Sequence, residues 1–152
     1  MLRLQRLQNR AARLVLNTPN RRSPSEPALR HLHWLPVTKR IDYKVALLTF
    51  KTLSCRQPGY LTSLLQPLSY NRSLRSSNQH LLSVPLAKTT FHSRAFSVYA
   101  PRLWNNLPLS LRILASTDSF DTTPQNFSSN LSLFKNGLKT FLFDSPLPSL
   151  IP

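Results

Sequence analysis

The longest proline-free stretch with a helical pattern of apolar positions follows Pro36 and runs to about residue 53. When its residues are placed at about 100° per step, apolar side chains cover nearly the whole circumference. Only Arg40, Lys44 and Lys51 form a consistently charged strip. Because a helix that is apolar nearly all round is normally buried between neighbours, the pattern predicts a central helix with one narrow basic strip in water.

A second helix is predicted over residues 2–17. Its apolar and basic positions recur every three or four residues on two adjacent strips, namely Leu4, Leu7, Ala11 and Leu14, and Arg3, Arg6, Arg10 and Arg13. In one interpretation, this helix docks on the central helix and leaves its arginines in water. In the other, the arginines follow a phosphate backbone. The pattern fits both.

Prolines divide the rest of the chain into short segments. Ser25 can cap a short helix, Thr38 can cap the central helix, and residues 60–65 have the pattern of one or two helical turns. The last helix is predicted over residues 131–143, with Gly137 as an unfavourable residue in its middle. Its apolar face would comprise Leu131, Phe134, Leu138 and Leu142.

Residues 96–107 keep helical spacing through Pro101, which predicts two helical pieces joined at that proline. Aromatic residues at helical spacing are more typical of a core than of a ligand site, and here they are Phe96, Tyr99 and Trp104. Arg94 and Arg102 would flank this aromatic face.

Composition favours helices over a sheet. The 152 residues include two glycines and thirteen prolines, so segments end at prolines and polar loops and not at glycine turns. We expect a mainly α fold, a small bundle of short proline-punctuated helices, with at most one minor β-hairpin from residues 81–84 and 89–91. The expected organisation is a basic helical domain (1–114), a divergent polar loop (115–130), a C-terminal helix (131–143) and a disordered tail (144–152).

Charge changes this picture most. The chain has 20 Lys and Arg against five Asp and Glu, a net charge of +15, and no acid lies between Asp42 and Asp118. Such an imbalance opposes a compact fold unless a polyanion or counterions offset it, and the usual polyanion is nucleic acid. Arginine is the commoner base, and it suits bidentate phosphate contacts and stacking better than lysine does. The alternative is a solvated basic surface.

Residues 68–79 are predicted to form a loop rich in serine, asparagine and arginine. Tyr70, Arg72 and Arg75 lie at its centre, where an aromatic ring and guanidinium planes could stack on the bases of single-stranded RNA. The alternative is a solvated surface linker.

Residue combinations typical of catalytic and metal sites are missing from the sequence. The single Cys55 excludes an internal disulfide and a multi-cysteine zinc site, and no histidine pair has zinc-ligand spacing. Asp118 and Asp121 are three residues apart, where helix capping is the expected role. No glycine-rich phosphate loop and no nucleophile arrangement is recognisable. We expect no catalytic residue, no metal and no cofactor.

No stretch approaches the roughly eighteen apolar residues of a membrane span, and the N-terminus lacks the apolar core of a signal peptide, so no membrane partner is expected. Residues 1–22 hold six arginines and no acid, a composition that also suits a mitochondrial presequence. We expect the nucleus or the cytoplasm in preference to the mitochondrion.

Five blocks of the chain resemble, in the same order, the recurring segments of one protein family. They are LQRLQNRAARLV (4–15), ALRHLHWLP (28–36, continued to 53 by VTKRIDYKVALLTFKTL), RSLRSS (72–77), RAFSVYAPRLWNNLPLSLR (94–112) and LFKNGLKTFLF (133–143). The family is the C-terminal region of the reverse transcriptase polyprotein of non-LTR (LINE-type) retrotransposons, in the clade that includes the chicken-repeat and jockey elements. The resemblance covers most of the chain except residues 113–130.

This resemblance implies a segment downstream of a polymerase domain. The family's polymerase site holds two metal ions on adjacent aspartates, and no such pair occurs here, so we do not expect this chain alone to be an enzyme. The resemblance implies a non-catalytic domain that binds RNA or an RNA–DNA hybrid and holds template near the polymerase. Its partners would be nucleic acid, with RNA favoured over DNA, and a reverse transcriptase catalytic domain or another protein.

Two alternatives stay open: a transposon-derived relic, and a helical protein-interaction domain without a selected nucleic-acid role. For the nucleic-acid interpretation, the candidate binding residues are Arg3, Arg6, Arg10, Arg13, Lys44, Lys51, Tyr70, Arg72, Arg75, Arg94 and Arg102.

Overall fold

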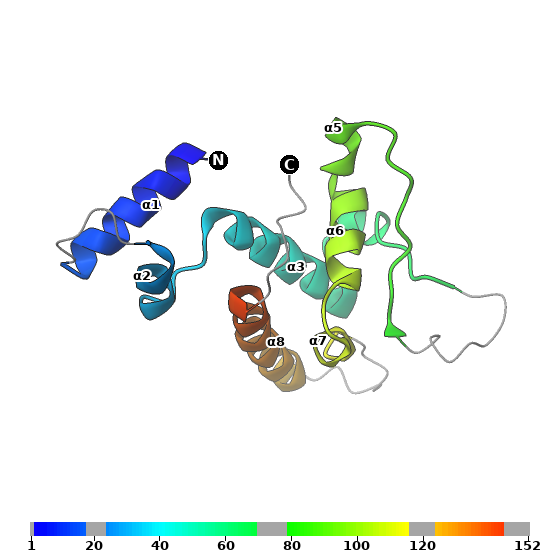
Figure 1. The fold of residues 1–152 in the computed structure, drawn as a ribbon. Helices are drawn as coiled ribbons and strands as arrows, with labels where there is room; N and C mark the ends of the chain where they lie inside the picture. Colours follow the sequence, from blue (N-terminus) through cyan, green and yellow to red (C-terminus); the bar gives the residue numbers. More distant parts are fainter. Residues whose placement is uncertain (1, 18–23, 70–78, 116–123, 145–152) are drawn as a thin grey trace.

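The structure, a computed structural model, describes residues 2–17, 24–69, 79–115 and 124–144. These ranges contain eight helices and no strand, which confirms the expected mainly α bundle (Figure 1). In chain order the helices are α1 (Leu2–Val15), α2 (Glu26–His31), α3 (Val37–Cys55), α4 (Gly59–Thr62), α5 (Thr90–Ser93), α6 (Phe96–Asn105), α7 (Leu109–Ile113) and α8 (Pro124–Asp144).

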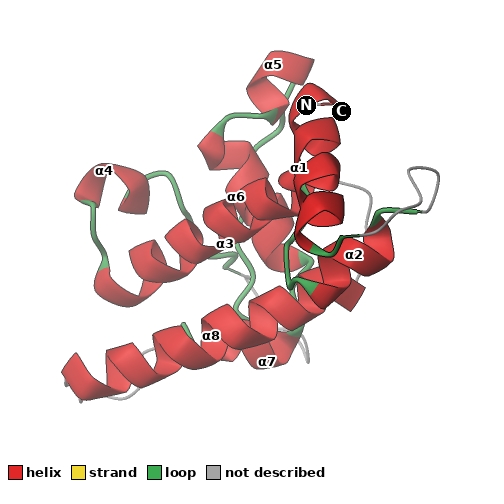
Figure 2. Ribbon diagram, turned by 90° about the vertical axis from the view of Figure 1, so that its left-hand side faces the viewer, coloured by secondary structure: helices red, strands yellow, loops and turns green. Residues whose placement is uncertain are grey.

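Helix α3 is the centre of the bundle. It packs against α6 and α8, and α1 and α2 lie beside its N-terminal end (Figures 1 and 2). The predicted buried central helix is confirmed, and Arg40, Lys44 and Lys51 form its exposed strip as expected. Two buried threonines are tolerated because their hydroxyls donate to helix carbonyls four residues earlier, Thr49 to Val45 and Thr52 to Leu48, each at 2.9 Å.

Three aromatic rings from three helices form the middle of the core. Phe50 of α3 stacks on Phe134 of α8 with ring centroids 4.3 Å apart, and Trp104 of α6 lies on the same phenyl ring at 6.0 Å. All three side chains are fully buried. Tyr99 is also buried and Phe96 packs against the core, so these aromatic residues have the core role expected of them.

A buried carboxyl and phenol join α3 to α6. The Tyr99 hydroxyl donates a hydrogen bond to the Asp42 carboxylate, which is 4% exposed. Burial raises the pKa of Asp42, and the bond from Tyr99 and the charge of Lys39 lower it by less. Burial and the neighbouring carboxylate raise the pKa of Tyr99. Because a buried polar group without a partner is costly, this bond fixes how the two helices pair.

Helix α6 is continuous through Pro101, so the expected break into two pieces is wrong. The proline deprives the Ser97 carbonyl of its helical partner, as any proline inside a helix must. Pro101 is itself fully buried, and packing around it offsets the missing bond.

The expected β-hairpin is also wrong for the described residues. Residues 89–91 belong to α5 and its cap, where the Thr89 hydroxyl accepts a bond from the amide of His92 at 3.1 Å. Residues 81–83 pair instead with residues 66–68, through a single bridge between Pro67 and Leu82.

Asn105 holds this extended segment against α6. Its side-chain amide accepts a bond from the Leu82 amide at 2.9 Å and donates one to the Leu82 carbonyl at 2.8 Å. The Trp104 indole donates to the His80 carbonyl at 3.1 Å. The backbone groups that a hairpin would have paired are therefore satisfied by side chains of α6.

Helix α8 begins at Pro124, seven residues before the predicted start, so the polar loop expected over 115–130 is wrong for residues 124–130. Proline suits the first position of a helix, and Phe127 anchors this early turn with its ring 6.4 Å from that of Phe50. The predicted apolar face of the helix is confirmed, with Phe134, Leu138 and Leu142 buried. The expected disordered tail, apart from Asp144, lies outside the described residues.

Gly137 allows α7 to approach α8 closely. A Cβ atom built on this glycine would lie 2.6 Å from Cδ2 of Leu111, a buried residue of α7. The residue that costs α8 intrinsic helix propensity thus makes room for a core leucine.

We expect Asp42→Asn to remove a pH dependence of stability. Because folding raises the pKa of Asp42, the carboxyl binds its proton more tightly in the folded chain. Its contribution to stability is full below the unfolded pKa and is lost as the pH rises through the folded pKa. Asparagine still accepts the Tyr99 bond but carries no charge.

Urea unfolding of both proteins at about pH 4 and about pH 8 measures this effect. The free energy of unfolding of D42N should increase relative to that of the wild type as the pH rises. A difference that stays constant with pH would contradict the assignment.

We expect Gly137→Ala to lower the free energy of unfolding by about 1 kcal/mol, because crowding of Leu111 outweighs the helix propensity gained. In a Leu111→Ala background the same substitution should raise it by about 1 kcal/mol. Denaturant unfolding of the four proteins in this double-mutant cycle measures the coupling. Additive effects would show that the two side-chain positions do not interact.

Candidate nucleic-acid interface

Helix α1 docks on the bundle through amides and not through its leucines. Gln8 donates a hydrogen bond from Nε2 to the Leu35 carbonyl, and Gln5 accepts one at Oε1 from the Val37 amide, both at 2.8 Å. Ala12, on the same face of α1, is fully buried. The docking on the central helix that one of the two interpretations proposed is present, but the side that makes the contact was not predicted.

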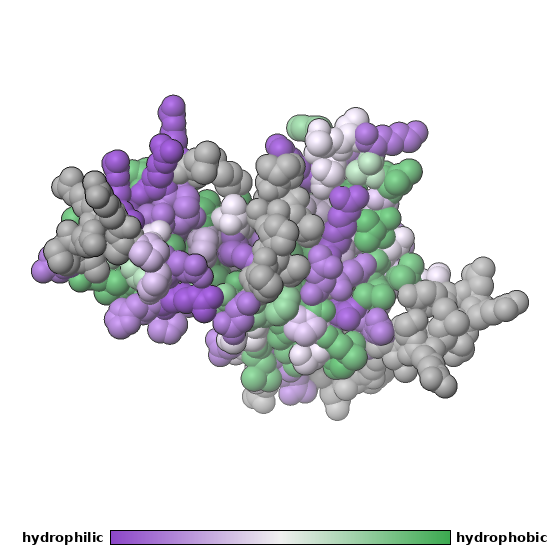
Figure 3. All heavy atoms as spheres, viewed as in Figure 1, coloured by the Kyte–Doolittle hydropathy of each residue, from purple (hydrophilic) through white to green (hydrophobic). Residues whose placement is uncertain are grey.

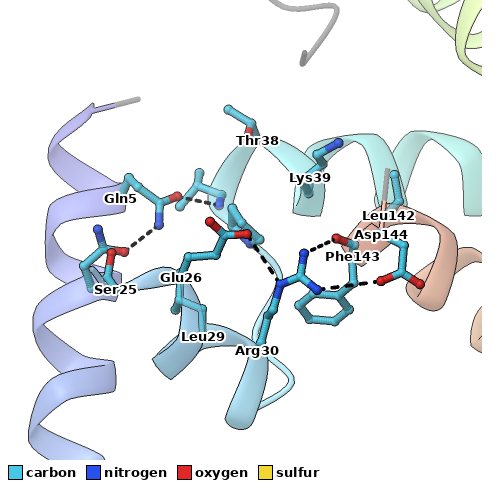
Figure 4. Close-up of a pocket in the computed structure, with 13 residues that line it drawn as sticks. Gln5, Ser25, Glu26, Leu29, Arg30, Thr38, Lys39, Leu142, Phe143 and Asp144 are labelled. Atoms are coloured by element: carbon cyan, nitrogen blue, oxygen red, sulfur yellow. Dashed lines mark hydrogen bonds and ion pairs between the residues drawn. The ribbon is translucent and has the colours of Figure 1, made fainter. Parts of the chain in front are cut away.

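Gln5 also provides the cap that Thr38 was expected to provide. Helix α3 begins at Val37, and Pro36 at its N-cap makes no side-chain cap bond. The Val37 amide is one of the helix-start donors that lack a partner within the helix, and Gln5 accepts its bond from another element. Gln5 in turn donates to Asn9 at 2.8 Å (Figure 4). The capping bond and the docking of α1 are thus one interaction.

Arg30 connects α2 to the C-terminal end of α8. Its guanidinium forms ion pairs with Glu26 at 3.4 Å and with Asp144 at 3.7 Å, and it donates a hydrogen bond to the Phe143 carbonyl at 3.1 Å (Figure 4). These groups line a cavity of about 640 Å³ between α1, α2, α3 and α8. The two ion pairs and the hydrogen bond are all solvent-exposed, so they contribute little to stability. Their main effect is to position α2 relative to the C-terminal end of α8.

The acids in the described part of the chain are all engaged. Asp42 is buried against Tyr99, and Glu26 and Asp144 both pair with Arg30. Asp118 and Asp121, with their expected capping role, lie outside the described residues. The exposed bases of α1 and α3 consequently face solvent without a carboxylate partner in the part that the structure describes.

The structure places the predicted binding residues in two groups. Exposed bases cluster on α1 and along the solvent strip of α3, and the members predicted from sequence are Arg3, Arg6, Arg10, Lys44 and Lys51. The two sets lie on helices that contact each other, because α1 docks at the N-terminal end of α3. Figure 3 shows hydrophilic side chains gathered over this end of the molecule.

The remaining candidates are less favourably placed. Arg13 is half-buried on α1 and has contacts of its own, and Arg102 is half-buried on α6. Arg94 is exposed at the end of α5, on the other side of the bundle from α1 (Figure 1). Tyr70, Arg72 and Arg75 lie outside the described residues.

The two ends of the segment that contains these three residues are held together. The Leu68 amide donates to the Leu81 carbonyl at 2.9 Å, and the Ser83 amide donates to the Gln66 carbonyl at 2.8 Å. Residues 66–68 and 81–83, on either side of this segment, therefore lie side by side.

The leucine strip of α1 lies in solvent. Leu4, Leu7 and Leu14 are 59%, 60% and 81% exposed, and Val15 beside them is also exposed. On a helical wheel these residues separate the docked amides from the arginine strip. One helix thus presents an apolar stripe and a row of guanidiniums side by side.

This surface can bind anions but shows no catalytic arrangement. Within the described ranges no cluster of three or more His, Cys, Asp or Glu side chains could hold a metal ion. Among the same residues, no helix is both long enough and apolar enough to cross a membrane. The guanidiniums of Arg3, Arg6 and Arg10 can bind phosphate groups, and the three residues span about 10 Å of the helix axis.

Sequence reasoning missed the residues that position this surface. Gln5, Gln8 and Ala12 recur every three or four residues as uncharged polar or small positions, and that pattern could have indicated a second face capable of docking. No local pattern indicates the role of Arg30, because its two partners on α8 are more than a hundred residues away.

No protein-family model, no curated protein and no solved structure matches this chain.

Proposed function

We propose that the protein is a non-catalytic RNA-binding domain whose interface is the basic surface of α1 and α3. The row of exposed arginines on α1, which has no carboxylate partner in the described part of the chain, is the observation on which the proposal rests. Guanidiniums spaced by one helical turn match consecutive phosphates of a nucleic-acid strand, and each contact releases counterions.

The fixed position of α1 supports this proposal. Two amide bonds hold the helix on the N-terminal end of α3, so the direction in which Arg3, Arg6 and Arg10 face solvent is set before any ligand arrives. Binding then costs less ordering of the protein than it would for a free basic arm.

We favour RNA, or an RNA–DNA hybrid, because of the segment 68–79, which is rich in arginine and serine and includes Tyr70. Both its ends are held together at the surface of the bundle. Aromatic rings and guanidinium planes on such segments bind unstacked bases, which single-stranded RNA offers more readily than duplex DNA does. On this proposal the chain derives from the C-terminal tail of a LINE-type reverse transcriptase, as the resemblance implies, and acts in the nucleus or the cytoplasm.

A second candidate function, protein interaction, is favoured by the exposed leucine stripe of α1. Leu4, Leu7 and Leu14 have the spacing with which one amphipathic helix packs on another. The adjacent arginines and the net charge of +15 disfavour a second copy of this chain and favour a partner helix whose leucines are flanked by glutamates.

We expect replacement of Arg3, Arg6 and Arg10 by glutamine to weaken binding to single-stranded RNA. The log–log slope of affinity against salt should also fall, by about 0.7 for each phosphate that is no longer neutralised, or about 2 in total. The measurement is a fluorescence-anisotropy titration at several salt concentrations with single-stranded RNA, duplex RNA and duplex DNA. Alanine at Arg72 and Arg75 should lower the slope by the equivalent of up to about two phosphates.

A matched control removes the same charge elsewhere, with glutamine at Lys88, Lys135 and Lys139. Lys88 lies just before α5, and Lys135 and Lys139 lie on α8, so all three are outside the proposed interface. Circular dichroism verifies that every variant is folded. If the slope falls as much in the control variant as in the α1 variant, binding reflects net charge alone and the proposed interface is wrong.

For the second function, Leu7→Ser with Leu14→Ser should abolish binding of a synthetic amphipathic helix that has leucines three and four residues apart and glutamates beside them. Both leucines are exposed, so the docking bonds of Gln5 and Gln8 stay intact. Binding to the wild type should persist in high salt, because apolar contact contributes most of it. Complete loss of binding at high salt would show that charge attraction, and not contact between leucines, holds the two helices together.

A further inference from the structure

A second cavity, of about 480 Å³, lies at the opposite end of α3 from the docked α1. It is lined by the C-terminal end of α3, by α4, by residues 80–82 and by α6 and α7. Apolar side chains, including Leu53, Leu82 and Trp104, form much of its wall. Two guanidiniums, those of Arg56 and Arg112, also line it.

Arg112 is the unusual member of this wall. Its residue is only 7% exposed, and two guanidinium nitrogens, Nε and Nη1, are buried without a hydrogen-bond acceptor. Burial lowers the pKa of this guanidinium, as expected for a cation removed from water. Arginine stays protonated in proteins, so a positive charge persists inside the bundle.

No carboxylate among the described lining residues compensates this charge. Within the part of the chain that the structure describes, no Asp or Glu lines the cavity, and the three acids of that part are engaged elsewhere. A buried cation without a partner is costly, and an anion that enters the cavity would relieve that cost.

The cavity favours a phosphate group over a carboxylate. Two arginines that line one cavity complement a dianion better than a monoanion, and each guanidinium can make charge-assisted bonds to phosphate oxygens. The volume lies within the range of small-molecule sites, and the leucine and tryptophan walls leave room for an apolar body attached to the phosphate.

We propose that this cavity is a phosphate-binding site in which Arg112 and Arg56 hold the phosphate group of a small ligand or of a nucleic-acid end. The site is separate from the α1 surface and does not depend on the proposed RNA function. Arg56, exposed at the end of α3, meets the anion at the entrance, and Arg112 meets it at depth.

Calorimetric titration of the whole chain with inorganic phosphate, at fixed ionic strength in sodium chloride, tests the proposal. The wild type should bind phosphate and should bind acetate far more weakly. Arg112→Met should weaken phosphate binding by at least about tenfold. In chloride buffer the same variant should unfold at a temperature equal to or higher than that of the wild type, because it removes an unpaired buried charge.

The control is Lys88→Met, which removes an exposed cation that belongs neither to the cavity nor to the proposed RNA interface and should leave phosphate binding unchanged. If R112M does not fold, Arg56→Met replaces it, because an exposed side chain at the entrance contributes little to the core. Equal weakening in K88M and R112M, or equal binding of acetate and phosphate, would overturn the proposal.

A further arm identifies the source of the phosphate. An RNA oligonucleotide with a 5′-phosphate is compared with the same oligonucleotide without it. Tighter binding of the phosphorylated form by the wild type, abolished in R112M, points to a nucleic-acid end. Equal binding of the two forms, together with retained binding of inorganic phosphate, points to a small phosphorylated ligand. Absence of any inorganic phosphate binding rejects the site, whatever the RNA result.

Discussion

The stacking of Phe50, Phe134 and Trp104 is the contact on which the rest of the bundle depends. Each ring belongs to a different helix, and the phenyl ring of Phe134 lies against both others. Aromatic contacts of this kind bury large areas and prefer offset geometry, so they fix the spacing of α3, α6 and α8 as well as holding them together. The basic strip of α3, the buried Asp42 and the cavity beside Arg112 all take their positions from this arrangement.

Local pattern predicted the helices and the core well, because periodicity reports directly on burial. The α3 strip and the apolar face of α8 followed from spacing alone. What failed depended on contacts between distant segments. The Asn105 amide pairs with the backbone that a hairpin would have used, and α8 gained its first turns partly through Phe127 against Phe50. A pattern read over neighbouring residues cannot identify the partner of Asn105 or that of Phe127, because both partners are far away in the sequence.

The candidate interface also depends on contacts between distant segments, which local sequence patterns do not predict. Sequence correctly placed bases on the exposed surfaces of α1 and α3, but it did not indicate which residues dock α1, and the structure uses Gln5 and Gln8. Hydrophobicity is an incomplete guide there because the start of α3 presents backbone groups, the Leu35 carbonyl and the Val37 amide, that need polar partners. Arg112 escaped notice because burial of a charged side chain has no local pattern.

The link between Arg30 and the last residues of α8 has a consequence for biosynthesis. The N-terminal helices are made first, yet the groups that connect α2 to α8, the Phe143 carbonyl and Asp144, are made more than a hundred residues later. Phe134, the middle ring of the core, is also late. The nascent chain can therefore form the contacts among α1, α2, α3 and α6 before α8, but the aromatic core is completed only after α8 has emerged from the ribosome.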